Sequence, residues 1–213
     1  KSHLIQNRLP FWQSIVNLEE NFDMLTRRFL LTGATALLSS TALTVATPAI
    51  ARKRKRFRLP KKYMPQRVWF RGYAPGTIVV DPRNHFLYLV ESRFRAIRYG
   101  VGVGKAGLTF KGTATIKRKA KWPSWTPTQN MIRRSPEKYA RFAGGVPGGP
   151  GNPLGARALY LYKGNMDTYF RIHGTTQPSS IGRSVSNGCI RMINEHVKDL
   201  YTRVPVGARV VVL

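Results

Sequence analysis

A mainly β fold with a few short helices is the class that the sequence predicts. From Thr77 onward the chain consists of short runs rich in β-branched and aromatic residues, separated by turns rich in Gly, Pro and Asn. Only two segments have helical patterns, and both are short. With 213 residues, 42% of them apolar, the chain can bury one ordinary core, so we expect one folded domain.

The first predicted strands form a hairpin. Residues 78–81 lead through a Pro-Arg-Asn turn into the apolar run 86–90. Further strands are expected at 95–103, 112–119, 156–162, 169–173 and 207–213. The strand 169–173 would leave His173 at its end.

Two short helices interrupt the strands. Ser135 as N-cap and Pro136 at the first helical position predict a helix through Phe142. A second helix is expected to begin with Asn194 as its cap. Its buried face would carry Val197, Leu200, Tyr201 and Val204.

Two glycine-rich segments are predicted to be loops. Residues 144–153 are mostly Gly and Pro, which is typical of a functional loop, and we expect it at the rim of a site. Residues 102–107 match G-x-G-x-x-G, but the residues that follow do not favour the helix of a dinucleotide-binding fold. A glycine turn between two strands is therefore the better interpretation.

The net charge of +27 predicts attraction to anionic polymers, whether nucleic acid, membrane headgroups or a cell-wall polyanion. Charge alone does not choose between them. Eight basic residues lie in the run 52–62. We expect residues 52–74 to be a basic, solvated linker or tail.

The front of the chain resembles an export signal. Residues 24–51 contain a basic start, an apolar run rich in small residues and an A-x-A cleavage pattern at 49–51. The pair Arg27 and Arg28 is similar to a twin-arginine signal. The status of the upstream extension 1–23 is open. So is the alternative that 29–51 stays as a membrane anchor, because the basic run beyond it disfavours translocation.

Cys189 is the only cysteine of the chain, and His173 precedes it by sixteen residues. A thiol and an imidazole are the minimum for an acyl-transferring nucleophile and its base. Arg191 and Arg183 could supply positive potential that favours the thiolate. The backbone N–H groups of Gly188 and Cys189 could receive an oxyanion.

A metal site is not predicted, and we expect no cofactor. The remaining histidines have no second histidine or cysteine near them in sequence, and the acidic residues are too scattered to suggest a carboxylate pair.

The stretch 172–192 closely resembles the catalytic domain family of L,D-transpeptidases (YkuD-like), whose motif is I-H-G-T followed by S-x-G-C-[IV]-R-[ML]. The similarity extends through 78–81, 99–104, 122–127 and 148–161, and covers about residues 75–213. It implies a β-sandwich with short helices, one of them after the cysteine. It also implies a thiol acyltransferase that acts on peptidoglycan stem peptides, outside the cytoplasm in the periplasm or cell envelope.

By this resemblance Cys189 attacks the third residue of a tetrapeptide stem and expels the terminal D-alanine, and a carbapenem would trap the same cysteine. His173 would be the base, and the Gly174 carbonyl would orient its ring. Substrate contacts would come from Arg191, Ser186, Asn187 and Tyr160. Many members carry His at the position of Asn187, and an amide does not titrate.

Alternatives remain open at this stage. The acceptor could be an amine, which gives cross-links, or water, which makes the protein a hydrolase on the same thioester. A non-enzymatic basic module that binds wall polymers is a third reading. Anionic cell-envelope polymers are expected partners and nucleic acid is not.

Overall fold

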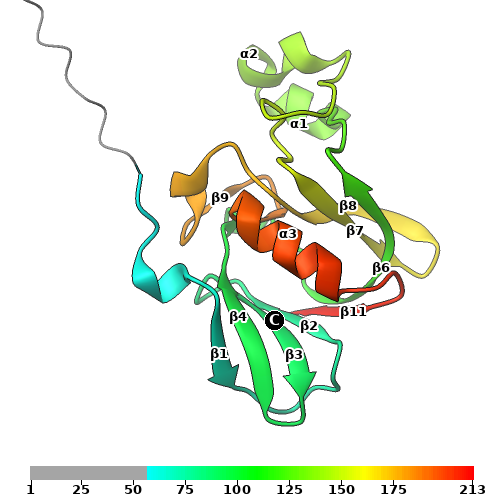
Figure 1. Ribbon diagram of the computed structural model, residues 1–213. Helices are drawn as coiled ribbons and strands as arrows, with labels where there is room; N and C mark the ends of the chain where they lie inside the picture. The colour runs from blue at the N-terminus through cyan, green and yellow to red at the C-terminus, as the bar shows by residue number, and fades with distance from the viewer. Residues whose placement is uncertain (1–56) are drawn as a thin grey trace, which may run out of the picture. The chain divides into compact units, whose positions relative to one another are not determined.

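Nine strands form one continuous mixed sheet in the computed structural model, which describes residues 57–213 (Figure 1). Their order is β1-β4-β3-β2-β11-β6-β7-β8-β10, and β5 and β9 form a small parallel sheet beside it. The mainly β fold with few short helices is thus confirmed. The export signal, the upstream extension and the possible anchor lie outside the described residues.

The strands and helices have the following bounds. The strands are β1 (Gln66–Trp69), β2 (Ile78–Asp81), β3 (Phe86–Ser92), β4 (Arg95–Gly100), β5 (Val103–Gly104), β6 (Gly112–Lys121), β7 (Arg157–Lys163), β8 (Met166–His173), β9 (Ser184–Ser186), β10 (Ile190–Arg191) and β11 (Arg209–Val212). The α-helices are α1 (Gln129–Arg134), α2 (Pro136–Tyr139) and α3 (Asn194–Arg203), and short 3-10 turns lie at Lys61–Tyr63, Ala140–Phe142 and Pro178–Ser180.

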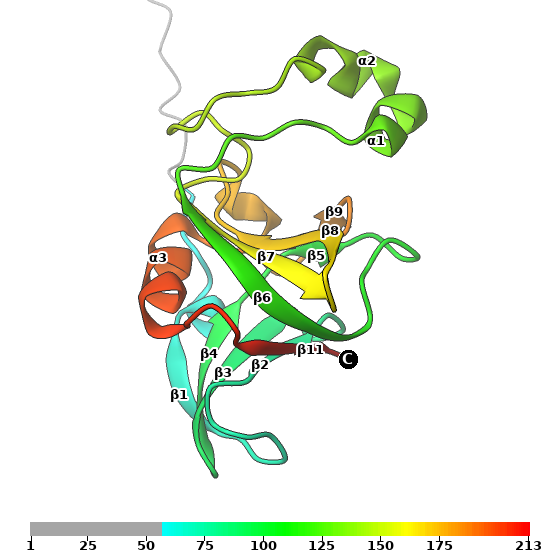
Figure 2. The same ribbon diagram turned by 90° about the vertical axis from the view of Figure 1, so that its right-hand side faces the viewer.

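Strand β11 joins the two halves of the large sheet. It pairs in parallel with β2 on one side and antiparallel with β6 on the other. The β1–β4 half and the β6–β10 half run in different directions and turn toward a common core (Figure 2). Leu87, Leu159, Leu161 and Val210 are fully buried there, so both halves contribute to one apolar interior.

Helix α3 closes the core with the predicted apolar face, since Val197 and Leu200 are completely buried. The predicted cap was wrong. Ile193 is the N-cap, and Asn194 is the first helical residue. The Asn194 Oδ1 instead accepts hydrogen bonds from the backbone N–H groups of Ala156 and Thr175, at 3.1 and 3.2 Å.

Helices α1 and α2 form a small lobe at one end of β6 and β7 (Figures 1 and 2). The sequence did not predict α1, whose cap Thr128 accepts a hydrogen bond from the Met131 N–H. The second helix begins at Pro136 as predicted, but it ends at Tyr139 and a 3-10 turn continues to Phe142. The Ser135 side chain makes no capping bond.

Part of the expected basic tail is folded. Gln66–Trp69 forms β1, which pairs antiparallel with β4 and makes one edge of the sheet. Segment 102–107 contains β5 and a turn and no helix follows it, which confirms the glycine-turn interpretation. Among residues 57–213, no helix is both long and apolar enough to cross a bilayer.

Candidate active site

The pairing of β10 with β8 brings the predicted thiol and imidazole to one face of the sheet. Arg191 is in register with His173, and Ile190 is in register with Ile172. Because side chains alternate along a strand, Ile172 and Ile190 enter the core while His173 and Arg191 share the opposite face. Cys189, two residues before Arg191, and Arg171, two before His173, follow the same alternation.

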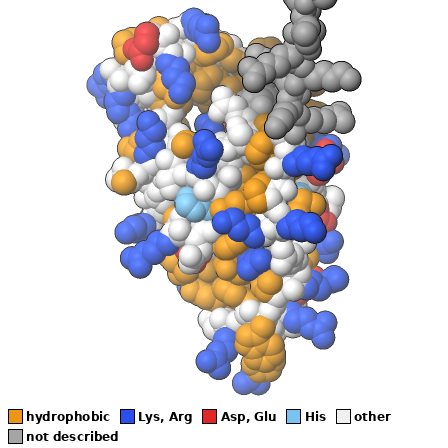
Figure 3. Space-filling model, turned by 90° about the vertical axis from the view of Figure 1, so that its left-hand side faces the viewer, with side chains coloured by type: hydrophobic (Ala, Val, Ile, Leu, Met, Phe, Trp, Pro, Cys, Tyr) orange, Lys and Arg blue, Asp and Glu red, His pale blue; other side chains and the backbone are white. Residues whose placement is uncertain are grey.

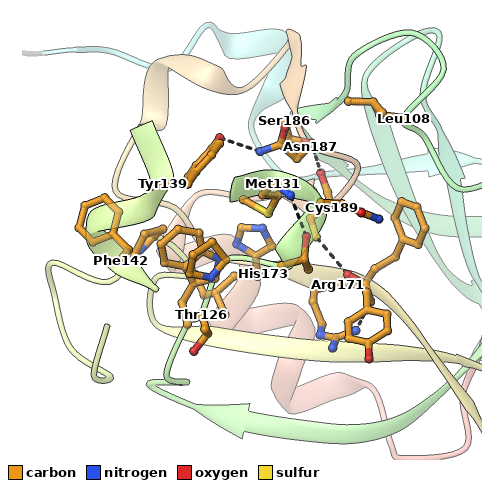
Figure 4. Close-up of a pocket in the computed structure, with 18 of the residues that line it drawn as sticks. Leu108, Thr126, Met131, Tyr139, Phe142, Arg171, His173, Ser186, Asn187 and Cys189 are labelled. Carbon is orange, nitrogen blue, oxygen red and sulfur yellow. Dashed lines mark hydrogen bonds between the residues drawn. The ribbon is translucent and has the colours of Figure 1, made fainter. Parts of the chain in front are cut away.

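These four side chains line a cleft of about 1340 Å³ (Figure 4). Its walls are the β8 and β10 edge of the sheet, the lobe with α1 and α2, and the loop before β6. Pro153 and Leu154 also line it, so the glycine- and proline-rich segment reaches the rim as expected. The cleft therefore surrounds Cys189 with groups from distant parts of the sequence.

His173 is buried, with 4% of its surface exposed, and its Nδ1 lies 2.5 Å from the Gly174 carbonyl oxygen. A carbonyl oxygen can only accept, so Nδ1 carries the proton and Nε2 is an acceptor. Burial, and then the positive charge of Arg191, lower the pKa of His173 to about 4. The imidazole is consequently neutral at ordinary pH, in the tautomer that a base needs.

Cys189 is half-buried, and its Sγ lies 3.7 Å from the Tyr169 carbonyl oxygen, to which the thiol donates. Burial raises the pKa of the Cys189 thiol, while Arg171 and Arg191 oppose that rise. Arg171 was missed from the sequence. Arg183, proposed in its place, is exposed on the loop before β9 and does not line the cleft.

The turn before Cys189 is held by its own backbone and by Ser186. The Ser186 hydroxyl donates to the Cys189 carbonyl at 2.6 Å and accepts from the Gly188 N–H at 3.1 Å. Gly188 has φ +124°, and a Cβ there would lie 2.5 Å from the Phe170 ring and 2.6 Å from the Leu108 carbonyl oxygen. Ser186 is buried, shapes this turn and also lines the cleft, where the resemblance expected a substrate contact.

Gly188 differs from the sequence prediction in one respect. Its N–H already has an acceptor inside the turn, whereas among the hydrogen bonds of the described residues none uses the Cys189 N–H. Gly104, in the glycine-rich segment 102–107, packs closely against Gly188. A Cβ at position 104 would lie 2.8 Å from Gly188 Cα, so the absence of a side chain there allows this close packing.

Asn187 connects the turn to the lobe. Its Nδ2 donates to the Tyr139 hydroxyl at 2.7 Å, and both residues line the cleft (Figure 4). Arg191 also lines the cleft, and its Nη1 donates to Gln177 Oε1 at 3.2 Å. Both residues are therefore positioned to meet a bound molecule.

Tyr160, which the resemblance placed among the substrate contacts, does not line the cleft. It is buried in register with Arg171, and its ring lies between two guanidinium groups, 4.0 Å from that of Arg118 and 4.3 Å from that of Arg171. Arg171 is further fixed by two hydrogen bonds to Asp167, at 2.7 and 2.8 Å. Tyr160 thus supports the cation beside the thiol.

The described part of the chain contains no group of three or more His, Cys, Asp or Glu side chains that could hold a metal ion. The cleft lining includes six Arg or Lys side chains and no Asp or Glu, so a bound molecule meets positive charge.

Comparisons with known proteins agree on one family. The model of the "L,D-transpeptidase catalytic domain" (YkuD) matches residues 75–212. The "Probable L,D-transpeptidase ErfK/SrfK" of Escherichia coli K12 is 38% identical over 153 residues, 70% of this chain and 48% of that protein. The "Probable L,D-transpeptidase YbiS" of the same strain is 34% identical over 137 residues, 63% of this chain and 43% of that protein. The chain thus spans about half the length of these relatives or less.

Many solved structures resemble the chain, and two of them differ widely in their sequence identity to it. A Brucella melitensis protein, named as a "Probable carnitine operon oxidoreductase caia", is 61% identical, with a TM-score of 0.51 over 73% of this chain and 96% of that one. The "Ldtfm-avibactam carbamoyl enzyme" is 19% identical, with a TM-score of 0.50 over 66% of this chain and 49% of that one, a likeness of fold. With the family model matched over most of the described residues, the chain belongs to the L,D-transpeptidase catalytic domain family.

Proposed function

We propose that this protein is a peptidoglycan L,D-transpeptidase that acts through a thioester on Cys189. The observation that carries the proposal is the shared face of β8 and β10, where the thiol, a neutral imidazole and two guanidinium groups line one cleft. The family and the curated relatives support the same activity. The Brucella protein is named as an oxidoreductase, but the glycine segment 102–107 of this chain does not support a dinucleotide-binding site. It leads into a turn, whereas a dinucleotide-binding motif leads into a helix.

The proposed first half-reaction transfers an acyl group to sulfur. Nε2 of His173 takes the thiol proton as Sγ attacks the carbonyl carbon of the third stem residue. The C–N bond to the terminal D-alanine then breaks, and the proton goes to the departing amine. A thioester and free D-alanine result. The resting pair is a neutral thiol and a neutral imidazole, in line with the raised thiol pKa and the lowered His173 pKa.

In the second half-reaction an acceptor amine attacks the thioester carbonyl carbon, and His173 takes the amine proton. The C–S bond then breaks, His173 passes the proton to the sulfur, and an amide cross-link and the free thiol result. We propose that the Cys189 N–H stabilises the oxyanion in both steps, because it has no other acceptor among the described residues. In this proposal Gly188 does not bind the oxyanion; its backbone conformation shapes the turn that presents Cys189. Arg191 and the cations of the lobe would bind the carboxylates of the stem.

This function places the protein outside the cytoplasm, where peptidoglycan is built. We propose that residues 24–51 direct export and are removed, which N-terminal sequencing of the exported protein would test. The high positive charge suits association with anionic polymers of the cell envelope.

The chemistry is tested by intact mass measurement after incubation with a tetrapeptide stem and, separately, with a carbapenem. The wild type should gain one acyl adduct with each and should release D-alanine from the stem. Cys189→Ala should gain none, and His173→Ala should acylate slowly, least so at high pH where more thiol ionises unaided. A folded wild type that releases no D-alanine would refute the proposal. Release of D-alanine without cross-linked product would assign a hydrolase instead.

A further inference from the structure

An exposed aromatic pair lies at the end of β1 and the β3–β4 turn. Trp69 is 71% exposed and Phe94 is 40% exposed. Their rings stack with centroids 4.8 Å apart and planes 6° from parallel, and the Phe70 N–H donates to the Phe94 carbonyl at 3.1 Å. Such large apolar surface at the edge of a sheet is costly in water unless something covers it.

Three exposed arginines lie within two residues of this pair in the sequence, namely Arg71, Arg93 and Arg95. The Arg93 guanidinium lies 5.2 Å from the centre of the Phe94 ring. None of the three forms an ion pair within residues 57–213, whereas neighbouring Arg67 pairs with Glu91 at 3.0 Å. The aromatic tip, as we call Trp69, Phe94 and these three arginines, therefore offers uncompensated positive charge beside apolar rings.

The end of β1 and the β3–β4 turn, which carry the aromatic tip, lie at the end of the domain away from the α1–α2 lobe (Figures 1 and 2). Figure 3 shows a hydrophobic projection at this lower end with Lys and Arg side chains on both sides. A projection of this kind suits an extended surface rather than a small ligand.

We propose that the aromatic tip docks on an anionic phospholipid bilayer. Trp and Phe side chains favour the level of the lipid headgroups, and arginines beside them pair with lipid phosphates. A neutral glycan fits less well. A neutral glycan carries no anionic group and would leave the charges of Arg71, Arg93 and Arg95, which have no carboxylate partner within residues 57–213, without a counter-charge. The proposal is independent of the chemistry at Cys189.

The test uses the full chain and a readout local to residue 69. Vesicles of phosphatidylcholine with or without phosphatidylglycerol carry brominated acyl chains that quench nearby tryptophan. The contribution of Trp69 is the wild-type fluorescence minus that of Trp69→Phe, which cancels the other tryptophans. We expect the Trp69 contribution to be quenched on the anionic vesicles. The quenching should be lost on neutral vesicles, at high salt, and in the Arg93→Gln/Arg95→Gln variant.

Met166 provides the matched control position. It is 74% exposed at the start of β8, in the hairpin that joins β7 to β8. In a Trp69→Phe background, Met166→Trp should show no quenching, even if another part of the chain holds the protein on the vesicle. Equal quenching at positions 69 and 166, no quenching at 69, or equal quenching on neutral vesicles would overturn the proposal. The proposal would also be overturned if soluble peptidoglycan glycan fragments changed the Trp69 fluorescence as much as the anionic vesicles do, or more.

Discussion

The cleft and the aromatic tip contain the same kinds of side chain but arrange them in opposite shapes. In the cleft, guanidinium groups and aromatic rings line a hollow beside Cys189, and Arg171 is fixed by Asp167 and the Tyr160 ring. At the tip, arginines and stacked rings project into solvent without carboxylate partners. Composition alone therefore does not assign a partner. Shape and the fixing of the cations distinguish a site for a peptide from a surface for a membrane.

The largest difference is expected between two glycines, one in each region. Gly188→Ala should remove acylation of Cys189 and lower the thermal stability, because the new Cβ meets the Phe170 ring and a backbone carbonyl and the residue has φ +124°. Gly72→Ala, near the tip, meets nothing within 4 Å although φ is +96°. It should cost only about 1–2 kcal/mol of backbone strain and leave acylation unchanged. Acylation rates and thermal unfolding of both variants provide the measurement. Equal effects would mean that the packing around Gly188 does not matter.

The pH dependence of stability should come from the cleft side. The pKa of His173 is about 4 in the folded state and near 6.5 when unfolded, so between these values the unfolded state binds a proton that the folded state does not. The free energy of unfolding should fall as pH drops from 6.5 toward 4, by about 3 kcal/mol from this residue. Denaturant unfolding at several pH values, compared with His173→Gln, isolates this contribution.

His85 and His196 also have lowered pKa values, mainly through burial, and should remain as a background in that variant. The aromatic tip contains no histidine, so vesicle binding through it should stay constant between pH 5 and 8. An identical pH profile for wild type and His173→Gln would contradict the buried neutral imidazole.

The cations of the lobe should matter for the stem peptide but not for membranes. Replacing Arg133, Arg134, Lys138 and Arg141 by Gln should raise KM for an anionic tetrapeptide by about tenfold at low salt, because long-range attraction is lost. The control, Arg71, Arg93 and Arg95 replaced by Gln, should leave KM unchanged. Steady-state D-alanine release at two salt concentrations separates the two sets, and a similar KM increase in both would indicate a general effect of net charge.

The smallest effect is expected from a single hydroxyl. Tyr139→Phe removes the acceptor of the Asn187 amide, worth about 1 kcal/mol, and should lower kcat/KM about fivefold with little change in stability. Tyr73→Phe is the matched control, because Tyr73 stacks on Phe70 near the tip and its hydroxyl makes no hydrogen bond within the described residues. A larger loss of kcat/KM in Tyr73→Phe than in Tyr139→Phe would show that the lobe does not position the turn.

Local patterns in the sequence predicted much of this molecule. The alternation in 169–173 predicted the strand that ends at His173, and the Ser-Asn-Gly-Cys stretch predicted the turn before β10. The sequence could have placed Arg171 on the same strand face as His173, because side chains two residues apart in a strand share a face. Only the pairing of β8 with β10, however, puts that face beside Cys189.

The features that were missed depend on distant partners. β1 contains little apolar pattern and exists because β4 offers it a paired edge. Asn194 looked like a cap because it stands at the start of a helix, yet its amide satisfies two backbone donors from other segments. Tyr160 was assigned to the substrate because it lies in the family-like stretch. Its register with Arg171, which sequence spacing does not reveal, turns its ring beneath that cation instead.

The position of β11 has a consequence for how the domain folds. Within the large sheet, β11 is the strand that pairs with both halves, and it follows the other described strands in the chain. Outside the sheet order, a bridge between Gly102 and Arg191 of β10 also connects the two sides. The β1–β4 half and the β6–β10 half can therefore each begin to form, but their pairing must wait until residues 209–212 have been synthesised. A nascent chain that lacks these residues keeps the sheet open between β2 and β6 and leaves part of the core exposed.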